Sequence, residues 1–105
     1  MICAKMLMRK GTLYGFDVHG HSGSATVGND IICAAVSSAV YLVANTLTEV
    51  CGCRANITEA DGKMQLVVDV ADVNKAQEVL RGLHIHLKGL VAQYPEFITI
   101  QLTEV

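Results

Sequence analysis

The segment Cys53–Val70, CRANITEADGKMQLVVDV, predicts a β-hairpin in the middle of the chain. Two runs of strand-like residues flank Asp61-Gly62, and this dipeptide suits the positive φ angles of a tight hairpin turn. The hairpin divides the rest of the chain into an N-terminal and a C-terminal part, and each part contains one helical pattern. Both parts therefore add a helix to the central hairpin.

The two helical patterns differ in character. From Asp30 to about Val50, apolar residues fall on nearly every face, as expected of a helix that is covered on more than one side, and Gly52 ends it. Residues 73–94 carry apolar residues at three-and-four spacing, which predicts an amphipathic helix that ends at Pro95. The first helix is therefore central to the fold or covers a partner subunit.

Strand-like runs fill the two ends of the chain. Residues 2–9 and 12–19, with Lys10-Gly11 between them, predict another hairpin, and residues 97–105 predict an edge-compatible strand. The resulting order, ββαββαβ, predicts an α+β fold in which two helices pack on one face of a small, mainly antiparallel sheet. A chain of 105 residues supports about one compact core, so residues 1–105 are expected to form a single domain.

Composition excludes several classes of partner. The net charge is -2, and no basic stripe is present that would neutralise phosphates, so no direct nucleic-acid partner is expected. The N-terminus lacks a small-residue cleavage site after a long apolar stretch, so no signal peptide is predicted. The longest apolar run, Ile31 to Ala44, is interrupted by Ser37 and Ser38, so no membrane partner is expected. These features predict a cytoplasmic protein.

A thiol near the start of the first helix is the main candidate for chemistry. Asp30 is expected to be the N-cap, and Cys33 then lies at about the third helical position. The helix dipole contributes only about 0.3 to 1 kcal/mol, less than the about 1.4 kcal/mol of a tenfold shift toward the thiolate. A neighbouring imidazolium favours the thiolate more strongly, and His19 and His21 are both available at strand spacing.

The residues on either side of Cys33 in the sequence add to the catalytic interpretation. Residues 22–29 form a loop rich in Gly and Ser, which is interpreted as a lid over a substrate cleft. Ser37 lies four residues after Cys33, hence on the same face of the helix. A nucleophile, a base and a supporting hydroxyl within one segment match the general pattern of covalent catalysis.

Two other interpretations of these residues are open. Cys33 is also explained as a small buried hydrophobic residue, because free cysteine is often part of a core. His19, His21 and Cys33 together would make a three-ligand zinc site, whereas Cys51 lies about 27 Å further along the helix and cannot join it. The preferred hypothesis contains no metal and no cofactor.

The remaining cysteines and histidines are assigned no chemistry. Because the chain has a core and no export signal, all four cysteines are expected to be reduced. Cys51 and Cys53 are interpreted as core or surface thiols, since one intervening residue is a weak metal or redox signal. His84 and His86 lie off the apolar stripe of their helix and are expected on the surface.

Two short motifs, Gly20-His21 and GNDIICAAVS from Gly28 to Ser37, resemble a known family. They are similar to the bacterial ribosomal-processing cysteine proteases called Prp. The pattern of that family is Gly-His, a short loop, Gly-x-Asp-apolar-apolar-Cys-Ala, and a Ser four residues after the Cys. The resemblance extends over the whole chain and includes the ending QYPEFI of the second helix, Gln93 to Ile98.

The resemblance implies roles for single residues. The catalytic histidine of the family corresponds to His21 and its nucleophile to Cys33, which selects His21 over His19. Gly20, Gly28, Asp30 and Ser37 occupy the supporting positions of the signature.

The resemblance also implies a substrate. The family removes a short N-terminal extension from a large-subunit ribosomal protein, number twenty-seven, by cutting after an aromatic residue. It acts in the bacterial cytoplasm as a homodimer without metal or organic cofactor. The alternative is a non-catalytic dimeric factor that binds a peptide or assists ribosome assembly.

Overall fold

The computed structural model describes the backbone of residues 1–20 and 27–105, and the side chains of residues 1–20 and 31–105. Its elements, in chain order, are β1 (Ile2–Arg9), β2 (Thr12–His19), α1 (Val27–Asn45), a π-helical turn (Thr46–Val50), β3 (Ala55–Ala60), β4 (Lys63–Val68), a 3-10 turn (Val70–Asp72), α2 (Val73–Gln93) and β5 (Ile98–Glu104). The predicted order ββαββαβ is confirmed.

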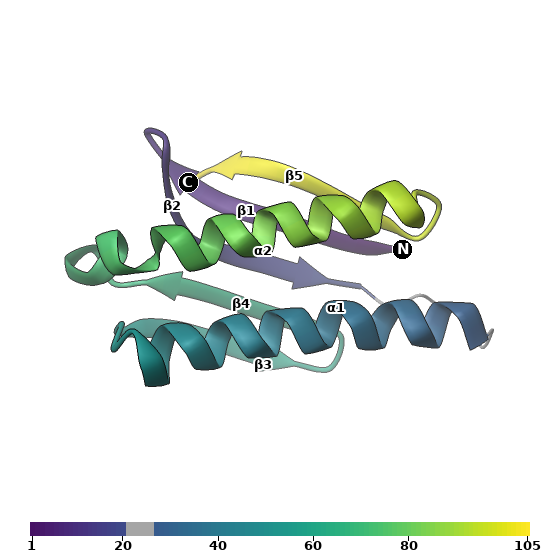
Figure 1. Cartoon of the computed structure of the whole chain (residues 1–105), viewed down its shortest axis with the longest axis horizontal. Coiled ribbons are helices and arrows are strands. Elements are labelled where there is room, and N and C mark those ends of the chain that lie inside the picture. The colour runs from purple at the N-terminus through teal and green to yellow at the C-terminus, as the bar shows by residue number, and fades with distance from the viewer. Residues whose placement is uncertain (21–26) are drawn as a thin grey trace.

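The strands form one sheet in the order β3-β4-β2-β1-β5. Neighbouring strands are antiparallel except that β5 runs parallel to β1, so the sheet is mainly antiparallel, as predicted. Figure 1 shows α1 and α2 side by side on the same face of this sheet, running in opposite directions. The predicted packing of two helices on one face is confirmed, and β5 lies at an edge, as the sequence indicated.

Both predicted hairpins are present, but their turns differ. In the β1–β2 turn, Lys10 and Gly11 both have positive φ angles, 52° and 81°. In the β3–β4 turn, Gly62 has a φ of 72° and Asp61 has a negative φ. The expectation of positive φ across the whole Asp-Gly turn is therefore wrong for Asp61, because the turn needs the left-handed conformation only at its glycine.

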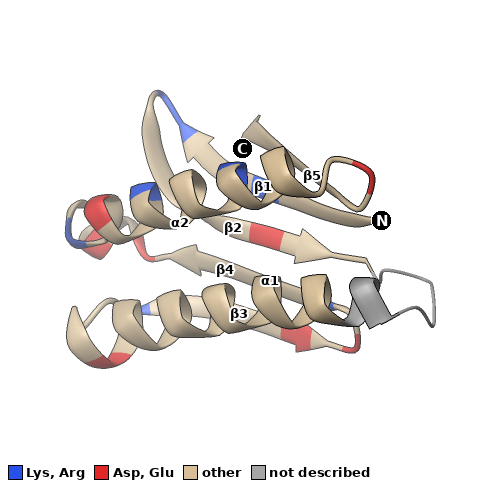
Figure 2. Cartoon of the chain, turned by 45° about the vertical axis from the view of Figure 1, so that its right-hand side comes forward, with Lys and Arg blue, Asp and Glu red and all other residues tan. Residues whose placement is uncertain are grey.

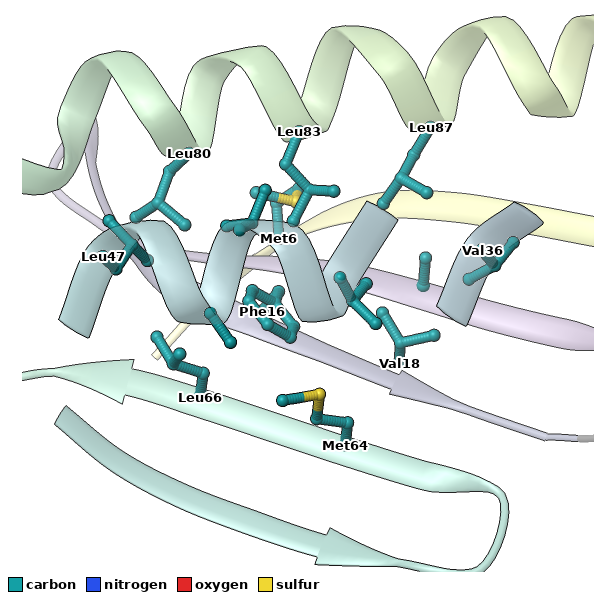
Figure 3. Packing of buried hydrophobic residues seen from close by; sticks show 14 of the residues in the cluster. Met6, Phe16, Val18, Val36, Leu47, Met64, Leu66, Leu80, Leu83 and Leu87 are labelled. Carbon is teal, nitrogen blue, oxygen red and sulfur yellow. The ribbon is translucent and has the colours of Figure 1, made fainter. Parts of the chain in front are cut away.

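The hydrophobic core lies between the sheet and the two helices. Successive side chains along β2 point to opposite faces, so Phe16 and Val18 enter the core while Asp17 and His19 belong to the other face. From the helix side, Val36 of α1 and Leu83 of α2 meet these strands (Figure 3). The side chains that are almost completely buried come from both layers: Met6, Phe16, Ile32, Leu47, Leu66, Leu80, Leu87 and Ile98.

The first helix begins and ends differently from the prediction. It begins at Val27, so Asp30 lies within its first turns and is not the N-cap that the sequence analysis expected. Its regular part ends at Asn45, and a π-helical turn continues to Val50, where the Cys51 N–H donates to the Thr46 carbonyl at 2.8 Å. Gly52 then follows with a φ of 69°, as predicted for the end of the helix.

The predicted loop of residues 22–29 does not extend to residue 29. Residues 27–29 belong to α1, so the interpretation of the whole range as a loop is wrong for these three positions. The interpretation of residues 22–26 as a lid lies outside the described residues.

The segment Ile31–Val50 is long and apolar enough to cross a membrane by length and composition alone. The expectation that Ser37 and Ser38 exclude such a span is therefore wrong by this criterion. In the structure, one side of the helix contributes Ile32 and Val40 to the core. The rest of its apolar surface faces away from the sheet, which explains why its hydrophobic pattern covers nearly every face.

Candidate active site

One face of α1 carries three polar or reactive side chains in a row. Cys33, Ser37 and Tyr41 follow one another at intervals of four residues, which places them on the same side of the helix. Cys33 is half-buried and is a free thiol, whereas Ser37 and Tyr41 are exposed. The predicted alignment of Ser37 with Cys33 is confirmed, because both side chains line the same cleft.

This cleft separates α1 from the β3–β4 hairpin. Its volume is about 270 Å³, and the ends of β1 and β2 close it on the side of the sheet. The lining combines apolar and polar residues: Ile2, Val18, His19, Gly20, Cys33, Val36, Ser37, Tyr41, Ala60, Asp61, Gly62, Lys63 and Met64. Cys33 is thus a thiol that opens into a pocket with apolar and polar walls, and not a residue enclosed in the core.

Gly20 brings the end of β2 to this cleft. Its N–H donates to the Gly62 carbonyl at 2.9 Å, which joins the end of β2 to the hairpin turn on the opposite wall. Its φ is 107°, a conformation that residues with a side chain rarely adopt, and a Cβ at this position would overlap the Met1 carbonyl oxygen. The glycine of the Gly-His motif is therefore required by the backbone geometry beside the cleft.

His19 has a partner on its own strand. Its Nδ1 lies 3.6 Å from Oδ1 of Asp17, an oxygen that is buried and has no hydrogen-bond partner within the described part of the chain. His19 also pairs in register with Cys3 on β1 and Lys63 on β4. Asp17 therefore gives His19 a carboxylate neighbour of its own.

Two of the three comparisons with known proteins gave matches. The family model described as cysteine protease Prp matches residues 1–99. The chain belongs to the cysteine protease Prp family. A comparison with curated proteins found no match.

Solved structures share the fold of this Prp-family chain. SMU.848 from Streptococcus mutans is 30% identical, with a TM-score of 0.80, and the match covers 100% of this chain and 96% of that one. The essential ribosomal processing protease Prp from S. aureus, crystallised in complex with a substrate peptide, is 21% identical with a TM-score of 0.88, over 98% of this chain and 100% of that one. The same S. aureus protease with a covalently linked product peptide is 22% identical, with a TM-score of 0.87 and the same coverage.

Membership of the Prp family makes this protein a cysteine protease. It therefore favours the enzyme over the non-catalytic peptide-binding factor as the interpretation of the cleft. Of the residues that the sequence singled out, the structure brings four to one cleft: His19, Gly20, Cys33 and Ser37. The predicted base His21 lies outside the described residues, and so does the side chain of Asp30, whereas the backbone of Gly28 and Asp30 is helical.

The zinc hypothesis gains no support from the Prp-family structure. Among the residues with described side chains, no group of three His, Cys, Asp or Glu is placed to hold a metal ion. His19 has the Asp17 carboxylate as a neighbour, and the third proposed ligand, His21, is not described.

The other three cysteines do not line the cleft. All four cysteines are free thiols, in agreement with the expected reduced state. Cys53 is buried, its Sγ lies 3.8 Å from the Asp72 carbonyl, and burial is the main cause that raises the pKa of its thiol. Cys51 is half-buried beside it. Both fit the predicted role of structural thiols.

His84 differs from its prediction. It is half-buried and not fully exposed, and burial, followed by the positive charge of Lys88, lowers its pKa. His86 is exposed, as expected, and lies at a second hollow between the two helices. That hollow is mainly apolar and shares no residue with the cleft at Cys33.

Sequence reasoning missed the residues that complete the cleft. Tyr41 lies two further turns along α1 from Cys33, and a hydrogen bond to the Glu59 side chain is the main cause that raises its pKa. Asp61 and Lys63 line the opposite wall. The spacing of Tyr41 from Cys33 was a usable signal, whereas the position of the hairpin depends on contacts between distant strands.

Proposed function

We propose that this protein removes the N-terminal extension of a large-subunit ribosomal protein, number twenty-seven, by a Cys33–His21 dyad. The observation that carries the proposal is the free thiol of Cys33 at a cleft between α1 and the β3–β4 hairpin. A half-buried thiol in an open cleft is accessible to a peptide, which a core thiol is not. The motif GNDIICAAVS supplies the match to the family's nucleophile position.

The proposed reaction has two steps. The Cys33 thiolate attacks the carbonyl carbon of the scissile bond, the C–N bond breaks, and the imidazolium of His21 protonates the leaving amine. His21 then takes a proton from water as the water attacks the thioester, which releases the new carboxylate and regenerates Cys33. Backbone N–H groups at the start of α1 are the proposed donors to the oxyanion.

The supporting positions of the signature have separate proposed roles. Gly20 has the proposed role of holding the end of β2 against the hairpin turn at the edge of the cleft. Ser37, one turn after Cys33 in the same cleft, is a proposed hydrogen-bond partner of the substrate or of His21. Gly28 and Asp30 belong to the first turns of α1, and their proposed role is to support the start of the helix that carries Cys33.

The proposals on domain, location, oligomeric state and partners rest on the same resemblance. We propose a single cysteine protease domain over residues 1–105 that acts in the cytoplasm as a homodimer, with neither cofactor nor nucleic-acid partner. The apolar exposed side of α1, including Ile31 and Leu42, is the proposed dimer surface. Figure 2 shows that Lys, Arg, Asp and Glu are absent from the visible part of this helix until its C-terminal end, and the sequence from Ile31 to Thr48 contains none of them.

Mass spectrometry of a synthetic peptide tests the proposed reaction. The peptide carries the apolar-aromatic extension of the ribosomal protein and is incubated with the wild type, Cys33→Ala, His21→Ala and Cys51→Ala. We expect cleavage at one bond by the wild type and by Cys51→Ala, and a rate at least about a thousandfold lower for Cys33→Ala. Cleavage by Cys33→Ala at the wild-type rate would contradict the assignment of the nucleophile.

A further inference from the structure

The face of the sheet that points away from both helices carries a thiol of its own. Figure 1 shows α1 and α2 on one face, and no helix in the described part of the chain covers the other. Of the three half-buried thiols, Cys33 and Cys51 pack against the hydrophobic core, whereas Cys3 is not among the side chains that do. Ile2 and Ala4 on either side of it are buried, so the alternation along β1 places Cys3 on the open face.

A histidine lies directly opposite this thiol. Cys3 and His19 are register partners in the antiparallel pairing of β1 with β2. The side chains of such partners point to the same face, with Cβ atoms about 4.5–5.5 Å apart, so the thiol and the imidazole are within reach of each other. The His19 side chain is 42% exposed, which leaves the pair open to a reactant from solvent. A thiol beside a histidine is a recognised arrangement of reactive cysteines.

The histidine in turn has a carboxylate beside it. Nδ1 of His19 lies 3.6 Å from Oδ1 of Asp17, and this oxygen is buried without a hydrogen-bond partner in the described part of the chain. A small rotation of either side chain would let Nδ1–H donate to this oxygen, which leaves Nε2 of the ring to accept the proton of the thiol. Cys3, His19 and Asp17 thus form a cluster of nucleophile, base and orienting group, separate from the thiol of Cys33.

Two lysines determine the charge around this cluster. Lys5 follows Cys3 by two residues on the same face of β1 and pairs in register with Asp17, and Lys63 of β4 pairs with His19. Strands lie about 4.8 Å apart, so Lys63 is about 10 Å across the sheet from Cys3, within reach of a long side chain. Asp17 is the only carboxylate in these two rows of the described strands. The surroundings of the thiol therefore favour an anionic reactant.

We propose that Cys3 is a site of reversible S-thiolation, at which the protein forms a mixed disulfide with an anionic low-molecular-weight disulfide. The Cys3 sulfur attacks one sulfur of that disulfide while His19 accepts the thiol proton. The new S–S bond forms, the old one breaks, and the second thiol leaves as a thiolate that takes up this proton. Cys3 is oxidised and the reactant is reduced, and Lys5 and Lys63 bind the carboxylates of the reactant. This site goes beyond the proposed function and does not depend on it.

Thiol exchange with two probes of opposite charge tests the site. The Cys33→Ala protein, which keeps Cys3 and lacks the cleft thiol, is incubated with oxidised glutathione, an anionic disulfide, or with cystamine, a cationic one. Mass spectrometry under non-reducing conditions measures the adduct at Cys3, in the tryptic peptide of residues 1–5, and at Cys51, a half-buried thiol outside the sheet that serves as internal reference. We expect oxidised glutathione to modify Cys3 at least about tenfold faster than Cys51.

Variants separate the parts of the site. Lys5→Gln/Lys63→Gln, in which the tryptic peptide extends to Arg9, is expected to lower the ratio of the glutathione rate to the cystamine rate at Cys3 by about threefold or more, as high salt does. Lys5→Arg/Lys63→Arg keeps the charge and is expected to keep the ratio. His19→Gln is expected to slow both probes by about tenfold or more, because the thiol loses its base whatever the charge of the reactant. Circular dichroism identifies any variant that fails to fold.

Three results would each overturn the proposal: Cys3 reacts no faster than Cys51, the loss of both lysine charges leaves the ratio of the two rates unaltered, or His19→Gln reacts like the wild type. Protein unfolded in urea provides the last comparison. There Cys3 and Cys51 are expected to react at similar rates, because the register of the strands is lost. A difference that persists after unfolding would also overturn the proposal, since it would come from the local sequence and not from the folded sheet.

Discussion

Two independent constraints meet at Gly20, at the point where β2 reaches the cleft. Its φ of 107° disfavours any side chain, and a Cβ would overlap the Met1 carbonyl oxygen. Its N–H also donates to Gly62 in the opposite wall. The glycine that precedes the predicted base is therefore needed to hold β1, β2 and the hairpin turn in their observed arrangement.

Gly20→Ala is expected to lower both stability and peptide cleavage. The strained φ and the overlap with Met1 together cost about 1–3 kcal/mol of unfolding free energy, measured by urea denaturation. Gly11→Ala is the matched control, because Gly11 also has a positive φ, 81°, but nothing lies within 4 Å of its added Cβ. If Gly20→Ala and Gly11→Ala lose the same unfolding free energy, the overlap with Met1 makes no contribution to the destabilisation.

The reactive residues were more predictable than their surroundings. The spacing of Cys33 and Ser37 on one helix is a local property, so the sequence predicted their shared face correctly. The cleft residues Tyr41 and Lys63 were missed because their proximity depends on how the β3–β4 hairpin packs against α1. The half-burial of His84 was missed for the same reason, since it depends on packing and not on the helical spacing of its neighbours.

At the scale of elements, Asp72 connects the start of β3 to the start of α2. The Arg54 backbone N–H and Nε donate to its Oδ2 at 2.9 and 3.0 Å, and Nζ of Lys75 lies 3.4 Å from its Oδ1. Asp72 is the buried charged residue among the described side chains. These bonds, the backbone one first, lower its pKa from 3.8 to about 2.

The Asp72 carboxylate should make stability depend on pH in a defined window. Because the pKa is lower in the folded protein, the unfolded chain binds the proton first as the pH falls. The stabilisation is therefore complete above pH 3.8 and is lost as the pH falls toward 2. We expect Asp72→Asn to be less stable at pH 7 and to show a smaller decrease over this window in urea unfolding.

Glu78→Gln is the control for this measurement, because Glu78 is an exposed carboxylate on α2, the helix that directly follows Asp72. The unfolding free energies of the wild type and Asp72→Asn are compared across this pH window. If the two fall in parallel, Asp72 is not the cause of the pH-dependent loss of stability.

Elements set by local signals were predicted well. The ranges 2–9 and 12–19 match β1 and β2, and α2 ends at Gln93, two residues before Pro95. The order of the strands could not be predicted, because the pairing of β4 with β2 and of β5 with β1 depends on contacts between distant parts of the chain. The start of α1 was placed too late because Asp30 matched the preferred residue type of an N-cap.

At the scale of the whole molecule, the outer side of α1 is unusually apolar for a surface. Ile31, Leu42 and Val50 are 59%, 67% and 79% exposed. Together with Ile85 of α2, also exposed, they leave apolar surface on the helical layer. These exposed side chains are the surface that the proposed homodimer would cover, and a stable homodimer covers about 800 Å² on each partner.

Leu42→Glu tests the proposed dimer surface. Analytical ultracentrifugation is expected to give the mass of a dimer for the wild type and a dissociation constant at least about tenfold weaker for the variant, since the interface would bury an unpaired charge. Val70→Glu places the same charge at a position that is 68% exposed outside the helical face, and it should remain dimeric. Dissociation by both variants alike would exclude α1 as the specific contact.

The parallel pairing of β5 with β1 joins the two ends of the chain, Ile2 opposite Ile98. The two hairpins form from neighbouring residues, but one edge of β1 stays unpaired until β5, about ninety residues later in the sequence, reaches it. Long-range parallel pairing is slow, and an unpaired strand edge is prone to aggregation. Ile2 lines the cleft, and its N–H donates to the Phe97 carbonyl at 2.8 Å. A folding chain therefore completes this side of its cleft only when residues 97 and 98 reach the N-terminal strand.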